Sequence, residues 1–182
     1  MRAGDEDRLR PGSEHDGVRF EGLALVEAAL MDTTFLECTF VGCDLTLARM
    51  GGATVRGTRF EDCRLLGVDL GAWRRDGLGI EAGFVSCDLD RAQAHHVDLR
   101  DCTFEGGRAR HAAWTGVDLR GVAFDGVDLT GARFDGCDLR DADLRGARGY
   151  RLDPTRNRVA GLRVALPEAL GLLAELGLRL EG

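Results

Sequence analysis

Apolar side chains recur at every fifth position along most of the chain. One series runs without interruption from Phe20 to Leu70, and a second series, shifted in phase, runs from Phe84 to Leu144. A small residue stands two positions before most of these centres, a polar residue lies between the two, and glycine often follows the centre by two positions. Neither a helix nor a single extended strand keeps a five-residue period, so the pattern predicts short strands joined by tight corners where glycine relieves the backbone.

A second interval, of 20 residues, predicts how these units stack. Four five-residue units fill one interval, so the sequence favours a square solenoid whose parallel coils stack about 4.8 Å apart. Parallel connections strongly prefer a right-handed path. The predicted fold is therefore all-β, a right-handed quadrilateral parallel β-helix. The residues that repeat at this interval are Phe20, Phe40 and Phe60; Phe84, Phe104 and Phe124; Asp98, Asp118 and Asp138; and Arg100, Arg120 and Arg140.

The break in phase between Phe60 and Phe84 indicates an irregular segment. A four-residue insertion near residues 72–80 explains it and keeps the phenylalanines on one face, whereas a one-residue deletion would move them to a new face. The insertion contains Trp73, Arg74 and Arg75, which are candidate contacts for a partner. For Trp73 the alternative is that its ring folds back over the edge of the coil.

These signals divide the chain into three parts. Residues 1–16 are expected to form a mobile tail, residues 17–164 the β-helix, and residues 165–182 a helix and tail. Pro167 suits the first turn of this helix and Gly177 its end. Its apolar stripe can cover the open end of the solenoid or join two copies of the chain. The residues expected in the dimer interface are Leu170, Leu173 and Leu176.

Charge and composition exclude several classes of protein. The formal net charge is -7, and there is no basic cluster, so we expect no direct binding of nucleic acid. No apolar run approaches the roughly 18–20 residues that cross a bilayer, and residues 1–7 lack the apolar core of a signal peptide. We therefore expect a cytoplasmic protein without membrane contacts.

Nothing in the sequence points to catalysis, a cofactor or a metal. All six cysteines occupy the small-residue positions of the repeat, which favours core packing, and no Cys-x-x-Cys pair is present. His95, His96 and His111 are interpreted as surface residues. No serine or cysteine has an oriented base beside it in the pattern, so the protein is not expected to be an enzyme.

The unit Ala142-Asp143-Leu144-Arg145-Gly146 resembles the repeat of the pentapeptide-repeat family. This resemblance extends over roughly residues 18–164 and implies the quadrilateral β-helix. The coil count and the C-terminal helix resemble the branch of that family that confers resistance to fluoroquinolones and albicidin. The resemblance implies a homodimer joined through its C-terminal ends, acting on type II topoisomerases, above all DNA gyrase.

An acidic rod of about seven coils would be roughly 34 Å long, and a dimer about twice that. The hypothesis is a DNA mimic that occupies the A-subunit saddle of DNA gyrase, and possibly topoisomerase IV, and protects the enzyme from quinolones or a natural poison. The alternative is an interaction scaffold with a partner that is not a topoisomerase. The phenylalanine face is the candidate binding face, because Asp98, Asp118 and Asp138 have arginines beside them. Its acidic residues are Glu21, Glu61, Asp62, Glu105, Asp125 and Asp143.

Overall fold

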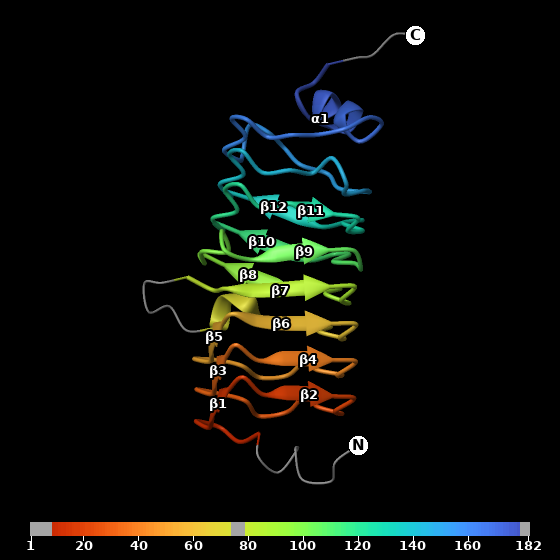
Figure 1. Cartoon of the computed structure of the whole chain (residues 1–182). Helices are drawn as coiled ribbons and strands as arrows, with labels where there is room; N and C mark the ends of the chain where they lie inside the picture. Colours follow the sequence, from red (N-terminus) through yellow and green to blue (C-terminus); the bar gives the residue numbers. More distant parts are fainter. Residues whose placement is uncertain (1–8, 74–78, 179–182) are drawn as a thin grey trace.

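The structure is a computed structural model that describes residues 9–73 and 79–178. It is a parallel β-solenoid of about 6 turns with one C-terminal helix, which confirms the predicted fold class. Figure 1 shows the coils stacked in chain order between the two ends of the chain. The strands are β1 (Glu14–Asp16), β2 (Arg19–Glu21), β3 (Thr34–Leu36), β4 (Thr39–Val41), β5 (Thr54–Arg56), β6 (Thr58–Glu61), β7 (Ala82–Val85), β8 (Gln93–His95), β9 (Thr103–Glu105), β10 (Ala113–Thr115), β11 (Phe124–Asp125) and β12 (Arg133–Asp135).

Each coil has four sides, which we number in chain order. Side 1 is the six-stranded sheet in the order β11-β9-β7-β6-β4-β2. Side 2 is held by isolated parallel bridges, such as Asp44 to Arg64. Side 3 contains the sheet β12-β10-β8, and side 4 contains the sheet β1-β3-β5, followed by bridges such as Asp98 to Asp118.

A stack of phenylalanine rings fills the interior behind side 1. Phe20, Phe40 and Phe60 pair in register along the sheet, and Phe84, Phe104 and Phe124 continue the stack. The centroids of successive rings are 4.7, 5.0, 5.4, 5.2 and 4.8 Å apart, close to the usual spacing of strands in a sheet. The stack therefore links every coil of side 1 to the next through direct ring contacts.

The register confirms the insertion. Phe60 lies beside Phe84 and Asp69 beside Gln93, so the extra residues fall between side 3 and side 4 of one coil. The phenylalanines stay on one sheet, and the alternative of a one-residue deletion is therefore wrong. A short 3-10 helix, η2 (Leu70–Ala72), begins the irregular segment, and the Asp69 carboxylate accepts a hydrogen bond from the Gly71 amide at 2.9 Å.

Trp73 folds back onto the coil, which confirms that alternative and rules out the partner contact that the sequence also offered. Its side chain is 1% exposed and packs against Phe60, with 6.2 Å between ring centroids. Trp73 directly follows η2, and its indole turns into the core of the solenoid. The proposed contacts Arg74 and Arg75 lie outside the described residues.

The solenoid begins before the predicted boundary at residue 17. Strand β1 pairs in parallel with β3, and its His15 is buried. The imidazole stacks on Phe35 with 5.6 Å between ring centroids, and its Nε2 lies 2.9 Å from the Ser13 hydroxyl. A histidine thus takes a central position of the repeat, and the search for apolar centres could not recognise it.

Helix α1 (Ala169–Glu175) is shorter than the predicted one and contains no fully buried residue. Gly177 ends it with a φ of 74°, and the Leu178 amide donates a hydrogen bond to the Leu173 carbonyl. This left-handed glycine is the usual termination of a helix. Leu172 packs against the last coil, while Leu170 and Leu176 are exposed. In the part of the chain that the structure describes, no helix has the length and apolar character needed to traverse a membrane.

Candidate interaction surfaces

The structure brings the predicted acidic residues together on side 1. Glu21, Glu61, Glu105 and Asp125 belong to strands of its sheet, and Asp62 follows β6 at a corner. Asp143 bridges to Ala123 beside the last strand. The alternation of each strand directs the phenylalanine inward and these side chains outward.

Arginines on the same side neutralise half of this set. Arg19 pairs with Glu21, Arg59 with Glu61 at 2.7 Å, and Arg145 with Asp143 at 2.6 Å. In each pair the two residues flank one inward-facing residue, so both side chains leave the sheet on the same face. The remaining three, Asp62, Glu105 and Asp125, are exposed, and no described guanidinium lies within ion-pair distance of them.

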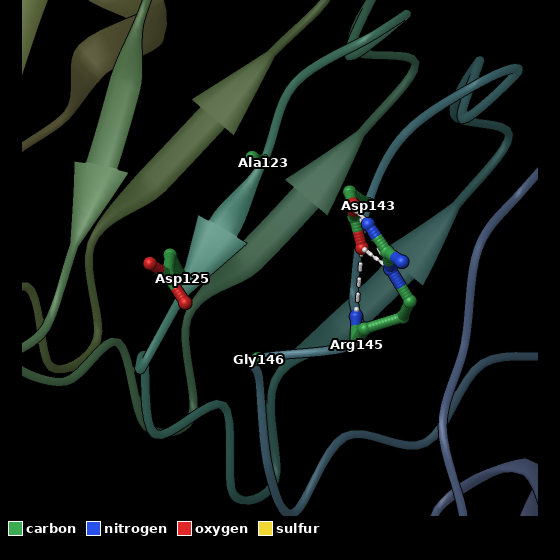
Figure 2. Close-up of a pocket in the computed structure, with 5 residues that line it drawn as sticks. All are labelled: Ala123, Asp125, Asp143, Arg145 and Gly146. Atoms are coloured by element: carbon green, nitrogen blue, oxygen red, sulfur yellow. Dashed lines mark hydrogen bonds and ion pairs between the residues drawn. The ribbon is translucent and has the colours of Figure 1, made fainter.

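A surface depression of about 420 Å³ lies at the C-terminal end of side 1. Figure 2 shows the Arg145 side chain folded onto Asp143, while Asp125 stands apart with no dashed line to it. The hydrogen bond from Arg145 lowers the pKa of Asp143 to about 2. Gly146 lies under Asp125, where a Cβ would meet the carboxylate oxygen Oδ1 at 2.4 Å. The depression is therefore lined by one paired and one unpaired carboxylate.

Side 4 is the self-paired ladder that the sequence predicted. Asp98 pairs with Arg100 at 2.6 Å, and Asp118 with Arg120 at 2.6 Å. Arg100 also reaches Asp118 in the next coil at 3.5 Å, so the ladder is cross-linked along the axis. The arginine hydrogen bond lowers the pKa of Asp98. Asp138 and Arg140 continue the pattern at 2.7 Å.

Three further acidic residues form what we call the acidic edge: Glu37, Asp101 and Asp141. Each is exposed and lies at a turn that leads from side 4 into side 1. None has an ion-pair partner among the described residues. The sequence analysis missed them because they fall on corner positions, where glycine is the commoner residue.

Side 2 carries an alternating column that the sequence analysis also missed. Asp44, Arg64, Asp88 and Arg108 follow one another in successive coils, and Asp128 and Arg148 complete the column. Arg64 pairs with Asp44 at 3.0 Å, Arg108 with Asp88 at 2.6 Å, and Arg148 with Asp128 at 3.4 Å. The column neutralises itself. Its signal in the sequence was a change in the sign of the charge from each coil to the next.

The cysteines are core residues, as predicted. All six are buried and free. Burial raises the pKa of the Cys87 thiol to about 11 and that of Cys102 to about 12. Cys63 stacks under Cys43, whose backbone amide donates to the Cys63 sulfur at 3.4 Å. Among the residues that the structure covers, no group of three or more histidines, cysteines or carboxylates is arranged to hold a metal ion.

These observations define a parallel four-sided β-solenoid whose outward positions are mostly charged and whose interior is closed. The family described as pentapeptide repeats matches residues 110–148, in 8 copies. The match over these residues agrees with the family that the five-residue pattern resembles.

Solved structures of pentapeptide-repeat proteins are similar to this chain. HetL, involved in heterocyst differentiation regulation in the cyanobacterium Nostoc sp. strain PCC 7120, is 16% identical; the match covers 86% of this chain and 87% of HetL, with a TM-score of 0.46. QnrB1, a plasmid-mediated fluoroquinolone resistance protein, is 19% identical; the match covers 91% of this chain and 100% of QnrB1, with a TM-score of 0.38. No curated protein sequence matches the chain.

Proposed function

We propose that this chain is a DNA mimic that binds DNA gyrase, and protects it from quinolones or from a natural gyrase poison. The observation that carries the proposal is the set of unpaired carboxylates on side 1 and at the acidic edge of the solenoid. Glu105 and Asp125 follow one another on side 1, and the acidic edge runs beside them. The proposal also rests on the resemblance of the repeat and the C-terminal helix to the resistance branch of the family.

The geometry suits a basic groove that normally holds DNA. Glu105 and Asp125 lie on adjacent strands, about one strand spacing, 4.8 Å, apart, and duplex DNA carries one phosphate per 3.4 Å of each strand. Backbone hydrogen bonds from coil to coil and the ring stack keep the charges in place. Complementary fields accelerate such an encounter, and salt weakens it. Competition for the A-subunit saddle needs no covalent step.

Neutralising the unpaired carboxylates is expected to weaken the effect on gyrase. Each exposed ion pair contributes about 0.2–1 kcal/mol, so Glu105→Gln with Asp125→Asn should raise the concentration for half-inhibition about two- to thirtyfold. Supercoiling and DNA-cleavage assays with gyrase and topoisomerase IV, with and without ciprofloxacin and at two salt concentrations, measure this effect.

The matched control removes the same amount of charge on the far sides of the rod. Glu27 and Asp32 are exposed corner residues away from side 1, so Glu27→Gln with Asp32→Asn should leave inhibition unchanged. An equal loss of inhibition in both double variants would show that inhibition depends on the net charge of the protein and not on these carboxylates. No effect of the unaltered protein on either enzyme at high micromolar concentration would contradict the proposal and favour a scaffold with another partner.

A homodimer through α1 belongs to the same proposal. Leu170 is 42% and Leu176 49% exposed, and Leu173 is half-buried, so one chain alone leaves the apolar stripe uncovered. We expect light scattering to give about twice the chain mass of 19.7 kDa. Leu170→Glu with Leu176→Glu should give a monomer, whereas Val26→Glu, at an equally exposed apolar position on side 2, should remain dimeric. A monomeric unaltered protein would contradict this part.

A further inference from the structure

One basic side chain per coil lies at or beside the edge between sides 2 and 3 in the C-terminal half of the solenoid. Arg91 lies at the turn before β8, His111 at the turn before β10, and Arg133 begins β12. Strands β8, β10 and β12 pair in register, which places the three residues in successive coils. Arg151 follows in the last coil, three positions after Arg148 of side 2. We call these four residues the basic edge.

The carboxylates beside Arg91 and Arg133 are already paired, Asp90 with Arg110 and Asp135 with Arg156. Asp90, next to Arg91, accepts from Arg110 at 2.6 Å and lies 3.2 Å from Arg108. The carboxylate of Asp90 is 13% exposed, so it is covered by these two guanidiniums. Arg91, His111, Arg133 and Arg151 are themselves exposed, and none is in an ion pair with another described residue.

Unpaired positive and unpaired negative side chains thus lie on opposite edges of the solenoid. The basic edge lies between sides 2 and 3, and the acidic edge lies diagonally opposite, between sides 4 and 1. The net charge of -7 averages over both edges. The expectation of no direct contact with nucleic acid came from that average and from the lack of a basic run in the sequence. The basic edge is assembled from residues about 20 positions apart, which a search for local clusters does not detect.

We propose that the basic edge binds the phosphate backbone of duplex DNA. The guanidiniums of Arg91, Arg133 and Arg151 and the His111 imidazole lie in four successive coils, over about 14 Å in total. One DNA strand carries about four phosphates over this length. Guanidinium groups bind phosphate oxygens through two parallel hydrogen bonds. Grooves for single strands add exposed aromatic rings on which bases stack, and the aromatic side chains in the described residues are buried. The edge therefore contacts a duplex backbone without reading its sequence.

This inference goes beyond the proposed function and does not depend on it. A chain whose acidic edge faced a basic protein surface would turn its basic edge outward, toward DNA. Binding to DNA alone is measured without any topoisomerase, so failure of one proposal leaves the other standing.

The test is the salt dependence of binding to a fluorescein-labelled duplex of about 20 base pairs, followed by fluorescence anisotropy. Neutralising about three phosphates gives a slope of about -2.7 in log K against log salt, and Arg91→Gln with Arg133→Gln should reduce it to about -1. The control, Arg19→Gln with Arg59→Gln, removes the same charge from side 1 and should leave the slope unchanged. Circular dichroism confirms that each variant is folded.

Two competitors distinguish the kinds of polyanion. Unlabelled duplex should displace the probe, while polyglutamate of equal total charge should displace it less than a tenth as well. Equal displacement by polyglutamate would assign the edge to an acidic protein and overturn the proposal. The absence of any anisotropy change at low salt, or equal slopes in the two double variants, would overturn it as well.

Discussion

Gly107→Ala is expected to break the solenoid between two coils. Gly107 has a φ of 72°, and a Cβ there would stand 2.2 Å from the Cys87 carbonyl oxygen and 2.7 Å from the Cys87 nitrogen. Both atoms belong to the backbone of the adjacent coil, so no side-chain rotation relieves the overlap. We expect the free energy of unfolding to fall by about 3 kcal/mol or more, measured by urea titration with far-ultraviolet circular dichroism.

Gly121→Ala is the matched control, since Gly121 also has a φ of 72° but has no atom within 4 Å of the Cβ position. Alanine there carries only the backbone cost of a left-handed conformation, about 1–2 kcal/mol. The difference between the two variants therefore isolates the contact between coils. Equal losses of stability would contradict the close approach at Gly107.

Trp73→Ala is expected to be the most damaging side-chain truncation in the irregular segment. The indole is among the largest fully buried side chains and packs on Phe60 of the ring stack. Truncating a buried tryptophan costs about 3–5 kcal/mol, because the site cannot collapse completely. A stability loss below about 1 kcal/mol would contradict the burial of Trp73.

Trp73→Phe separates the effect of the ring's volume on stability from the effect of the unsatisfied indole nitrogen. The indole nitrogen is buried without a hydrogen-bond partner in the described part of the structure. Phenylalanine removes this unsatisfied group and retains most of the apolar contact, so we expect a loss of less than about 1.5 kcal/mol. The same urea titration, with the fluorescence of Trp114 as a second signal, compares both variants.

The 20-residue repeat predicts some of the ion pairs on the surface of the solenoid. Asp98 and Arg100 repeat together every 20 residues, so the sequence could predict that side 4 pairs with itself, and the structure confirms the contacts. On side 1 the same two-residue spacing distinguishes Glu61 from Glu105, and the structure confirms the pair of Glu61 with Arg59. Glu61 has Arg59 two positions earlier, whereas threonine stands at the equivalent position before Glu105.

The sequence by itself determined the coil, its four sides and the place of the insertion, because a five-residue period with inward apolar centres has one geometry that buries them all. Tertiary structure alone decided the burial of Trp73, the start of the solenoid at His15 and the unpaired charges at the edges. The first two depend on space left by irregular backbone, which has no period. The last depends on which guanidinium reaches which carboxylate across neighbouring coils, and that is a matter of distance rather than of order along the chain.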